Sequence, residues 1–519
     1  MWMRELNVIE SYNPATLEKV GEVEEIEPEH LAKIITRARK GQKKLEKTSV
    51  KDRTRLLEKL MDYVIDHMDE IARVIHIETG KPKLEAINSD ILAGLGMVRY
   101  TIDYLKEVLK RHKIKFKGMR IPMWYMGRTS YISPKPLGII GIISPWNFPF
   151  GIPFSQVVQA IAVGNAVILK PSSETPMTGL KIKEVLDKAG FPKDLLQVVP
   201  GSGSKIGSAL VKSEVNRIIF TGSVNVGKKI MEMASQKLTP VTLELGGKSP
   251  MIVFEDADLE RTVQGAVWGS FVNTGQMCAG IKRIYVQEGI YEQFLQRFKE
   301  QTEQLNQGWG WQHPEISMGP LINEGALLEM EKHVKRAKEQ GAKILTGGKK
   351  HPDLKGYFFE PTIITKAKQE SDVVQKEIFG PIVPVLPFKT EEEAIRMAND
   401  SEFGLYGSVW TTDLEKGKRI AEQMTMGTIA VNNHAYTYGI PHTPWGGNKN
   451  SGFGRTHGNF GFEELMEPHH IHVDEGKIEK ELWWQPYDEN KLEAQKDIAD
   501  VLFRKKYTKI FSLLRKFKK

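Results

Sequence analysis

The sequence predicts an α/β fold built on a parallel sheet with crossover helices. From residue 137 onward, short apolar runs are each followed by a Gly/Pro/Ser turn and then by a helical pattern. The first 115 residues are mostly helical, with apolar residues at three- and four-residue spacing in 31–45, 52–67 and 91–110. Strands that alternate with helices are typical of parallel sheets, whose ligands bind at the carboxyl ends of the strands.

The expected strands are 138–144, 166–169, 195–199 and 217–220, and each leads directly into a turn. A second αβ region with the same alternation follows at about 247–450. Segments 119–136 and about 464–476 are predicted to be separate extended pieces, and residues 481–519 look appended.

The charge and composition limit the partners and the compartment. The net charge is +8, but residues 504–519 hold eight basic residues and no acidic one, which leaves 65 basic and 65 acidic residues elsewhere. A neutral body argues against a nucleic-acid groove. The single cysteine allows no internal disulfide, and the N-terminus lacks the apolar core of a secretory signal, so we expect a cytoplasmic protein.

Cys278 is the only cysteine in 519 residues, and it lies between small, flexible residues that include Gly275 and Gly280. A lone cysteine cannot build a cysteine metal cluster, and no metal site is expected. It is either an inert core residue or a nucleophile. Its flanks favour a backbone that approaches a ligand closely, and therefore chemistry.

Two turns are candidates for nucleotide binding. Gly203 and Gly207 open a helix after a strand, with one residue more than the usual dinucleotide spacing, so alone they are equally a simple helix start. Gly222 and Ser223 form a second strand–turn–helix, whose N–H groups suit a pyrophosphate. Lys170 ends an apolar strand, where it is either solvated or a ribose ligand.

Asn147 and Glu244 are polar residues in apolar surroundings. Asn147 is either a turn-forming residue or an amide donor for an oxyanion. Glu244 either faces solvent from a strand or is partly buried, in which case its pKa is raised and it can act as a general base.

Six motifs together resemble the signature series of the aldehyde dehydrogenase superfamily, in its order, over about residues 8–476. They are Pro145-Trp146-Asn147-Phe148-Pro149, the turn 220–227, the strand 243–248, Gly275-Gln276-Met277-Cys278, Glu377-Ile378-Phe379-Gly380-Pro381, and Pro444-Trp445-Gly446-Gly447 with Ser451-Gly452-x-Gly454-Arg455.

The resemblance implies a Rossmann-like nucleotide-binding domain, an α/β catalytic domain and a small two-part β oligomerisation flap, in a homodimer or homotetramer. The expected boundaries are 1–118 and 137–246 for the nucleotide domain, 119–136 and 451–480 for the flap, 247–450 for the catalytic domain and 481–519 for a basic amphipathic extension.

The resemblance also implies roles. Cys278 would attack the aldehyde, Asn147 and the Cys278 N–H would hold the oxyanion, and Glu244 would activate the water that hydrolyses the thioester. NAD or NADP would be bound by Lys170, Ser173, Gly203, Gly207, Gly222, Ser223, Glu377, Phe379 and Trp146. Relatives that transfer the acyl group to coenzyme A characteristically lack the glutamate at Glu244, so we expect a free carboxylic acid as product.

The cofactor and the substrate are less determined. Many NAD-preferring relatives carry Glu three residues after the lysine at 170, whereas this chain has Ser173 there and Glu174 next, so we expect NADP to be tolerated. Cys278 has Met277 and Ala279 as neighbours and no arginine, and Tyr436, Tyr438 and Trp445 fall in the segment that borders the substrate tunnel in relatives. This favours an apolar aldehyde, aliphatic, lipid- or isoprenoid-derived, or aromatic, over an acid semialdehyde.

Two alternatives stay open at this point. A non-catalytic binding protein on the same fold would have lost the nucleophile, the oxyanion donor or the base, and all three are present. The segment 489–519 has a helical pattern with Ile498, Leu502, Phe503, Tyr507, Ile510, Leu514 and Phe517 near one face. It either lies on an anionic membrane, packs on the protein or its mate, or is a solvated end.

Overall fold

The computed structural model describes residues 7–115, 127–511 and 513. The chain divides into two compact units. Unit 1 consists of Met1–Lys106 and Pro136–Met466, and unit 2 of Glu107–Lys135 and Glu467–Lys519.

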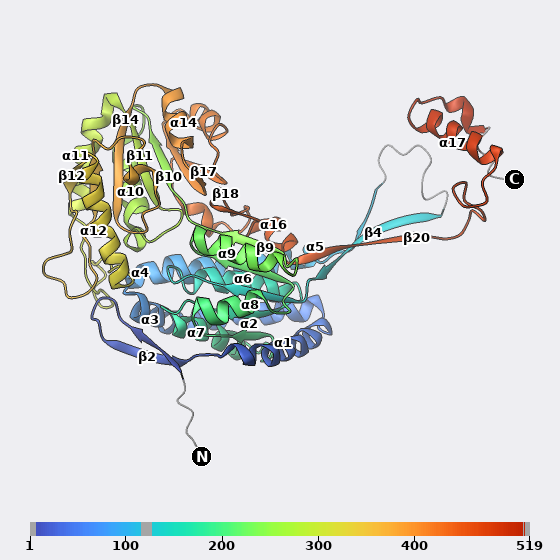
Figure 1. The fold of residues 1–519 in the computed structure, drawn as a ribbon, viewed down its shortest axis with the longest axis horizontal. Helices are drawn as coiled ribbons and strands as arrows, with labels where there is room; N and C mark the ends of the chain where they lie inside the picture. The colour runs from blue at the N-terminus through green and yellow to red at the C-terminus, as the bar shows by residue number, and fades with distance from the viewer. Residues whose placement is uncertain (1–6, 116–126, 512, 514–519) are drawn as a thin grey trace, which may run out of the picture. The chain divides into compact units, whose positions relative to one another are not determined.

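Unit 1 contains a six-stranded sheet in the order β19-β9-β8-β5-β6-β7 (Figure 1). Its strands are β5 (Ile139–Ile143), β6 (Ala166–Lys170), β7 (Leu196–Val198), β8 (Arg217–Thr221), β9 (Val241–Glu244) and β19 (Gly452–Phe453). The four expected strands are all present and all parallel, and β19 alone runs antiparallel, beside β9. Every residue of β5 and β6 is buried, as expected for central strands with helices on both faces.

The helices of this half confirm the sequence pattern and add to it. The expected helices are α1 (Leu31–Glu46), α2 (Val50–Asp66) and α5 (Ala93–Val108). Further helices are α3 (Met68–Thr79), α4 (Lys83–Glu85), η2 (Ala86–Leu92), α6 (Gly151–Ala162), α7 (Pro176–Lys188), η3 (Gly203–Gly207), α8 (Ser208–Val211) and α9 (Val224–Ser235). A hairpin of β1 (Val8–Tyr12) and β2 (Lys19–Glu24) lies in the region expected to be helical.

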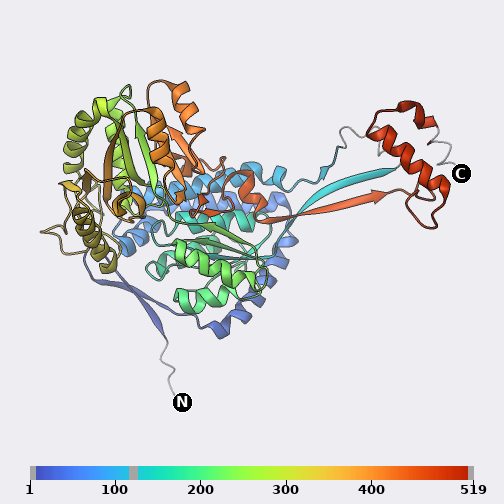
Figure 2. The ribbon, with the colours of Figure 1, turned by 45° about the horizontal axis from the view of Figure 1, so that its top comes forward.

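Unit 1 also contains a seven-stranded sheet in the order β12-β13-β14-β11-β10-β16-β17, drawn in green to orange in a separate lobe in Figure 2. Its strands are β10 (Ser249–Val253), β11 (Ile281–Gln287), β12 (Lys343–Thr346), β13 (Thr362–Thr365), β14 (Ile382–Phe388), β16 (Tyr406–Trp410) and β17 (Thr428–Val431). The helices around it are α10 (Leu259–Phe271), α11 (Tyr291–Glu303), α12 (Glu324–Glu339), α13 (Asp372–Gln375), α14 (Glu391–Asn399) and α15 (Leu414–Ala421). Buried side chains such as Phe254, Tyr285 and Phe298 fill the two faces of this sheet.

The strand β19 and helix α16 (Gly458–Glu463) belong to unit 1, since β19 pairs with β9 and unit 2 resumes only at Glu467. The segment 451–480, expected to belong to the flap, is thus divided between the two units at Met466. The pairing of Gly452 with Glu244 explains the difference, because it ties this segment to the edge of the six-stranded sheet.

Unit 2 contains a three-stranded sheet in the order β20-β4-β3, made of β3 (His112–Lys113), β4 (Arg128–Pro136) and β20 (Met466–Asp474). Arg128 donates to Asp474 at 2.6 Å across it. The two extended segments expected from the sequence correspond to β4 and β20, and residues 119–126 lie outside the described residues.

The tail of unit 2 is a small helical unit with its own apolar cluster. Helix α17 (Glu489–Leu502) ends where the expected pattern continued, and η7 (Tyr507–Lys509) follows a left-handed Lys505 with φ 62°. Ile498 and Ile510 pack on Leu482, Ala494, Val501 and Leu513, but Phe503 is 81% exposed. The pattern is therefore not one continuous amphipathic face in the described part, and Leu514 and Phe517 lie outside it.

In the described ranges no helix is long and apolar enough to cross a membrane. Within the same ranges, no group of three or more His, Cys, Asp or Glu side chains could hold a metal ion.

Candidate active site

Cys278 lies in a strained loop between η4 (Val272–Gly275) and β11. Asn273 and Thr274 have left-handed φ values of 50° and 57°, which non-glycine residues rarely adopt. Gly275 has φ 70°, and a Cβ there would lie 2.2 Å from the carbonyl oxygen of Gly380, so only glycine fits. Strain of this kind persists where the surroundings fix the backbone, and it is concentrated at functional sites.

Buried side chains fix the loop on both sides of the cysteine. Before it, the Lys282 ammonium donates to the carbonyl oxygens of Gly275 and Gly380. After it, His434 Nε2 lies 2.8 Å from the Ala279 carbonyl oxygen, and burial lowers the pKa of His434 to about 4. The imidazole is therefore neutral at pH 7, and its N–H can donate to that carbonyl.

The surroundings of the Cys278 thiol favour its protonated form. Burial raises its pKa to about 12, and the charges of Glu244 and Glu377 act in the same direction. The backbone N–H groups of Ala279 and Cys278 lower it, but by less. These opposing effects indicate a sulfur that is close to two carboxyl groups and also close to amide donors.

Glu244 ends β9 with its carboxyl group buried, so the structure excludes the solvent-facing alternative. Burial raises the pKa of Glu244 to about 8, although Arg455 lowers it in part. Its Oε1 atom has no hydrogen-bond partner among the described residues. Such a carboxyl group can exchange a proton near neutral pH, which a general base requires.

Asn147 follows β5 and is 4% exposed. Its Nδ2 donates to the Gln276 carbonyl oxygen at 3.1 Å, so the amide lies beside the Cys278 loop. The backbone carbonyl oxygen of Asn147 accepts hydrogen bonds from Lys81 Nζ at 2.8 Å and from Asn273 Nδ2 at 2.9 Å. The structure thus brings the nucleophile candidate and the oxyanion donor candidate together.

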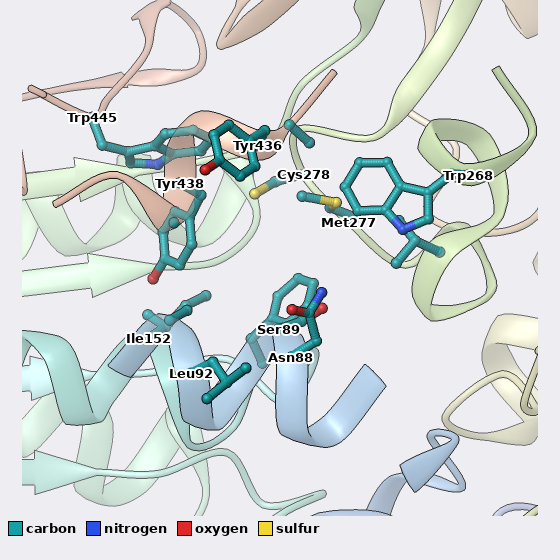
Figure 3. Close-up of a pocket in the computed structure, with 15 residues that line it drawn as sticks. Asn88, Ser89, Leu92, Ile152, Trp268, Met277, Cys278, Tyr436, Tyr438 and Trp445 are labelled. Atoms are coloured by element: carbon teal, nitrogen blue, oxygen red, sulfur yellow. The ribbon is translucent and has the colours of Figure 1, made fainter. Parts of the chain in front are cut away.

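Cys278 opens into a cavity of about 230 Å³ in unit 1. Figure 3 shows the sulfur atoms of Cys278 and Met277 between Trp268 on one side and Tyr436, Tyr438 and Trp445 on the other. The lining residues are Asn88, Ser89, Leu92, Ala93, Phe148, Ile152, Trp268, Val272, Met277, Cys278, Ala435, Tyr436, Tyr438, Gly439 and Trp445. None of these lining side chains carries a charge.

Tyr436, Tyr438 and Trp445 line this cavity, as the resemblance implied. Sequence reasoning missed Trp268 from α10 and Asn88, Ser89 and Leu92 from η2. No motif marks these residues, and only their exposure on otherwise packed helices distinguishes them, as with Trp268 at 42%.

The predicted adenosine-side residues gather at the carboxyl ends of β6 and β8. Lys170 is buried at the end of β6, and a Cβ on Gly207 would lie 3.7 Å from its side chain. Its ammonium, which has three N–H donors, makes one hydrogen bond to a described residue, the Pro171 carbonyl oxygen at 2.9 Å. Burial lowers the pKa of Lys170 to about 8.

Three further adenosine-side positions lie in the segments that follow β6, β7 and β8. Ser173 donates to the Gly201 carbonyl oxygen at 3.3 Å, and space lies open beside Gly203. Ser223 is the N-cap of α9 after the Gly222 turn, but its side chain makes no capping bond. The open space beside Gly203 and the Ser223 hydroxyl at the start of α9 fit a dinucleotide, because phosphate oxygens accept from donors at a helix N-terminus.

The nicotinamide-side candidates lie near Cys278. Glu377 accepts a hydrogen bond from the Gly247 N–H at 3.0 Å, and burial raises its pKa. A Cβ on Gly246 would lie 2.1 Å from the Glu377 carboxylate, so glycine is needed for this approach. The rings of Phe379 and Trp146 meet edge to face at 5.5 Å.

Comparison with known proteins identifies the class. Residues 2–471 match the aldehyde dehydrogenase family. The chain is 36% identical to a mitochondrial succinate-semialdehyde dehydrogenase of Oryza sativa subsp. japonica, over 89% of this chain and 86% of the relative. It is also 36% identical to a betaine aldehyde dehydrogenase of Bacillus subtilis, over 89% and 93%.

A solved NAD+ complex of an aldehyde dehydrogenase from Bacillus cereus superposes with a TM-score of 0.85 at 32% identity, over 90% of this chain and 93% of that one. The chain therefore belongs to the aldehyde dehydrogenase family. It is an NAD(P)-dependent enzyme: the relatives include an Escherichia coli succinate-semialdehyde dehydrogenase named for NADP(+), 33% identical, as well as the NAD+ complex.

Proposed function

We propose that the protein oxidises an apolar aldehyde to the free carboxylic acid through a thioester on Cys278. The observation that carries this proposal is the Cys278 thiol on an uncharged cavity. The Asn147 amide bonds to the loop that carries Cys278, and the Glu244 carboxyl group raises the pKa of the thiol. The Cys278 thiol first gives its proton to solvent water. The thiolate sulfur then forms a bond to the carbonyl carbon, the C=O π pair moves to oxygen, and negative charge develops there. The second N–H of the Asn147 amide and the Cys278 N–H stabilise that oxygen.

The cofactor would be held by Lys170, Ser173, Gly203, Gly207, Gly222 and Ser223 at one end and by Glu377, Phe379 and Trp146 at the other. When bound, the nicotinamide supplies the acceptor for the hydride that leaves the aldehyde carbon. Glu244 then takes a proton from water, which attacks the thioester and releases the acid and the Cys278 thiol. Because Glu244 is present, water is the acyl acceptor.

The uncharged cavity supports the apolar substrate. A semialdehyde brings a second carboxylate, and burying that charge without a cation costs several kcal/mol. Several relatives are named for semialdehydes. In this chain, however, the cavity lining is uncharged and includes Trp268, Tyr436, Tyr438 and Trp445, which favours an aliphatic, isoprenoid or aromatic aldehyde.

We also propose that the protein is cytoplasmic, on the strength of its single cysteine. We propose that it forms a homodimer or a homotetramer, because the β20-β4-β3 sheet belongs to a compact unit of its own. Size measurement by light scattering tests this state, and a monomeric mass contradicts it.

For the tail we propose contact with an anionic phospholipid surface. Trp483, Trp484, Tyr487 and Phe511 are each more than half exposed, and Trp and Tyr side chains suit a membrane interface. Part of the basic charge is neutralised, since Asp500 pairs with Arg504, Lys506 and Lys509. The exposed aromatic side chains therefore support this contact more strongly than the net charge does.

Flotation with phosphatidylserine vesicles tests the contact. The full chain should float, and a Trp483→Ser/Trp484→Ser variant should float much less. The membrane contact is contradicted if the full chain and the variant float equally. It is also contradicted if the aromatic residues are buried against a second copy of the chain.

Measured aldehyde-dependent NAD(P)H formation tests the reaction. We expect activity with apolar aldehydes that Cys278→Ser abolishes and that Met277→Leu, beside it in the cavity, retains. Activity that survives Cys278→Ser contradicts the proposed function.

A further inference from the structure

A buried ion pair lies behind the oxyanion residue. Lys81 Nζ and Asp90 Oδ2 are 2.6 Å apart, and both side chains are fully buried. Lys81 directly follows Gly80, the left-handed cap that ends α3, whereas Asp90 lies in the π-helical turn η2. Two charges buried in this way cost desolvation energy, so such a pair is often neutral or unfavourable for stability compared with apolar residues of the same volume.

The pair forms hydrogen bonds with both ends of one short segment, residues 147–151. Lys81 Nζ donates to the Asn147 carbonyl oxygen at 2.8 Å. Asp90 Oδ1 accepts from the N–H groups of Phe150 at 3.1 Å and Gly151 at 2.9 Å, where α6 begins. The ammonium also lies 4.3 Å from the centre of the Phe148 ring.

Asn273 links this segment to the nucleophile loop. Its Nδ2 donates to the Asn147 carbonyl oxygen at 2.9 Å and to the Gln276 carbonyl oxygen at 3.1 Å. The Gln276 carbonyl oxygen also accepts from Asn147 Nδ2 at 3.1 Å. The backbone and the side chain of Asn147 are thus held by one closed set of bonds, and Lys81 supplies the charged donor of that set.

We propose that Lys81, held by Asp90, is a positioning residue that fixes the Asn147 amide where the oxyanion forms. The inference rests on the proposed oxyanion role of Asn147. Donors stabilise developing charge only when they are placed in advance, and a displacement of about 1 Å can cost about a hundredfold in rate. The Lys81 ammonium bonds to the Asn147 backbone and to Asp90, and Asp90 bonds to the N–H groups at the start of α6, so each acts through the position of Asn147 rather than on the substrate.

A double-mutant cycle on the holoenzyme tests the proposal. The rate of NADH formation in the first turnover is measured for the wild type, Lys81→Met, Asn147→Ala and the double variant. We expect Lys81→Met to lower this rate at least about tenfold in the wild type, and less than about twofold in the Asn147→Ala background. Equal losses in both backgrounds overturn the inference.

Two further measurements separate this role from stability and from the proposed function. Arg53→Met removes a half-buried cation that also donates to backbone carbonyls, those of Leu45 and Ala162, and should destabilise the protein without the rate loss. The NAD+ dissociation constant should be the same for Lys81→Met and the wild type. If Asn147→Ala itself leaves the rate unchanged, the oxyanion role fails and not only the inference.

Where Lys81→Met does not fold, Asp90→Asn in both backgrounds decides by the same criterion. It keeps the shape of the side chain and weakens its hold on the ammonium. If Asp90→Asn lowers the rate in the wild type but not in the Asn147→Ala background, the inference is supported. If it lowers the rate equally in both backgrounds, the inference is overturned.

Discussion

The side-chain amide of Asn147 donates to the backbone carbonyl of Gln276, two residues before Cys278, at 3.1 Å. This bond joins the carboxyl end of β5 in the six-stranded sheet to the loop that precedes β11 in the seven-stranded sheet. It uses one N–H of the amide, and the described residues offer the second N–H no acceptor, so that N–H is available for the proposed oxyanion role. The proposed oxyanion donor is therefore bonded directly to the loop that carries the proposed nucleophile.

Asn147→Ala should lower kcat by about 10²–10³-fold, the usual cost of one oxyanion-hole donor. Asn165→Ala is the matched control, because Asn165 is also buried but bonds to the Gly138 N–H and the Leu465 carbonyl oxygen. It should lower Tm without a comparable loss of kcat. Steady-state kinetics and thermal unfolding of both variants check this, and equal losses of kcat would contradict the oxyanion role.

The hydrolytic rate should rise with pH through about 8. Glu244 acts as a base only as carboxylate, and burial raises its pKa to about 8. Below this value the carboxylate fraction falls about tenfold for each pH unit, and the rate of thioester hydrolysis should fall with it. A single-turnover pH profile measures this.

Glu244→Gln provides the control for that profile. It should keep the first burst of NADH and remove the pH-dependent second phase. A wild-type profile that is flat from pH 6 to 9, or a Gln variant that turns over normally, would refute the base assignment.

Ser173→Glu should disfavour NADP. A carboxylate there would repel a 2′-phosphate, so kcat/KM for NADP should fall more than about tenfold and that for NAD much less. Glu174→Gln should leave the ratio nearly unchanged, because the Glu174 carboxylate already accepts from Asn323 Nδ2 at 3.0 Å. A wild-type kcat/KM for NADP more than about a hundredfold below that for NAD would show that the prediction is wrong.

Apolar chain length should govern substrate affinity. Each methylene buried in the cavity contributes about 0.8 kcal/mol, so KM should fall about fourfold per methylene from propanal to hexanal. Trp268→Ala should weaken this dependence, since Trp268 lines the cavity. A higher kcat/KM for succinate semialdehyde than for pentanal would reject the apolar substrate.

The strands β5, β6, β7 and β8 followed from apolar runs and the turn residues after them. Cys278, Asn147 and Glu244 were candidates from their surroundings, and their roles, which the resemblance implied, stay predictions. Whether Glu244 faced solvent or the interior did not follow, because a strand end is compatible with both. That choice depends on β19, which returns from about 200 residues away to cover the edge.

Other features lay beyond local pattern. The β1–β2 hairpin, with partly exposed and alternating residues, gave little signal beside long helices. Lys81 and Asp90 look like ordinary surface charges in sequence, and only tertiary packing buries them. In the tail, Lys505 adopts a left-handed conformation that interrupts the helix, so the apolar residues after it do not stay on one face.

The central claim is a covalent acyl group on Cys278. The Glu244→Gln variant is allowed to react with hexanal and NAD+, and the reaction is then quenched. Intact-mass and peptide analysis of the quenched protein tests the claim directly. We expect one hexanoyl group per subunit, located on the peptide that carries Cys278 and absent when the cofactor is omitted. An unmodified Cys278 during a full burst of NADH, or an acyl group on another residue, would contradict it.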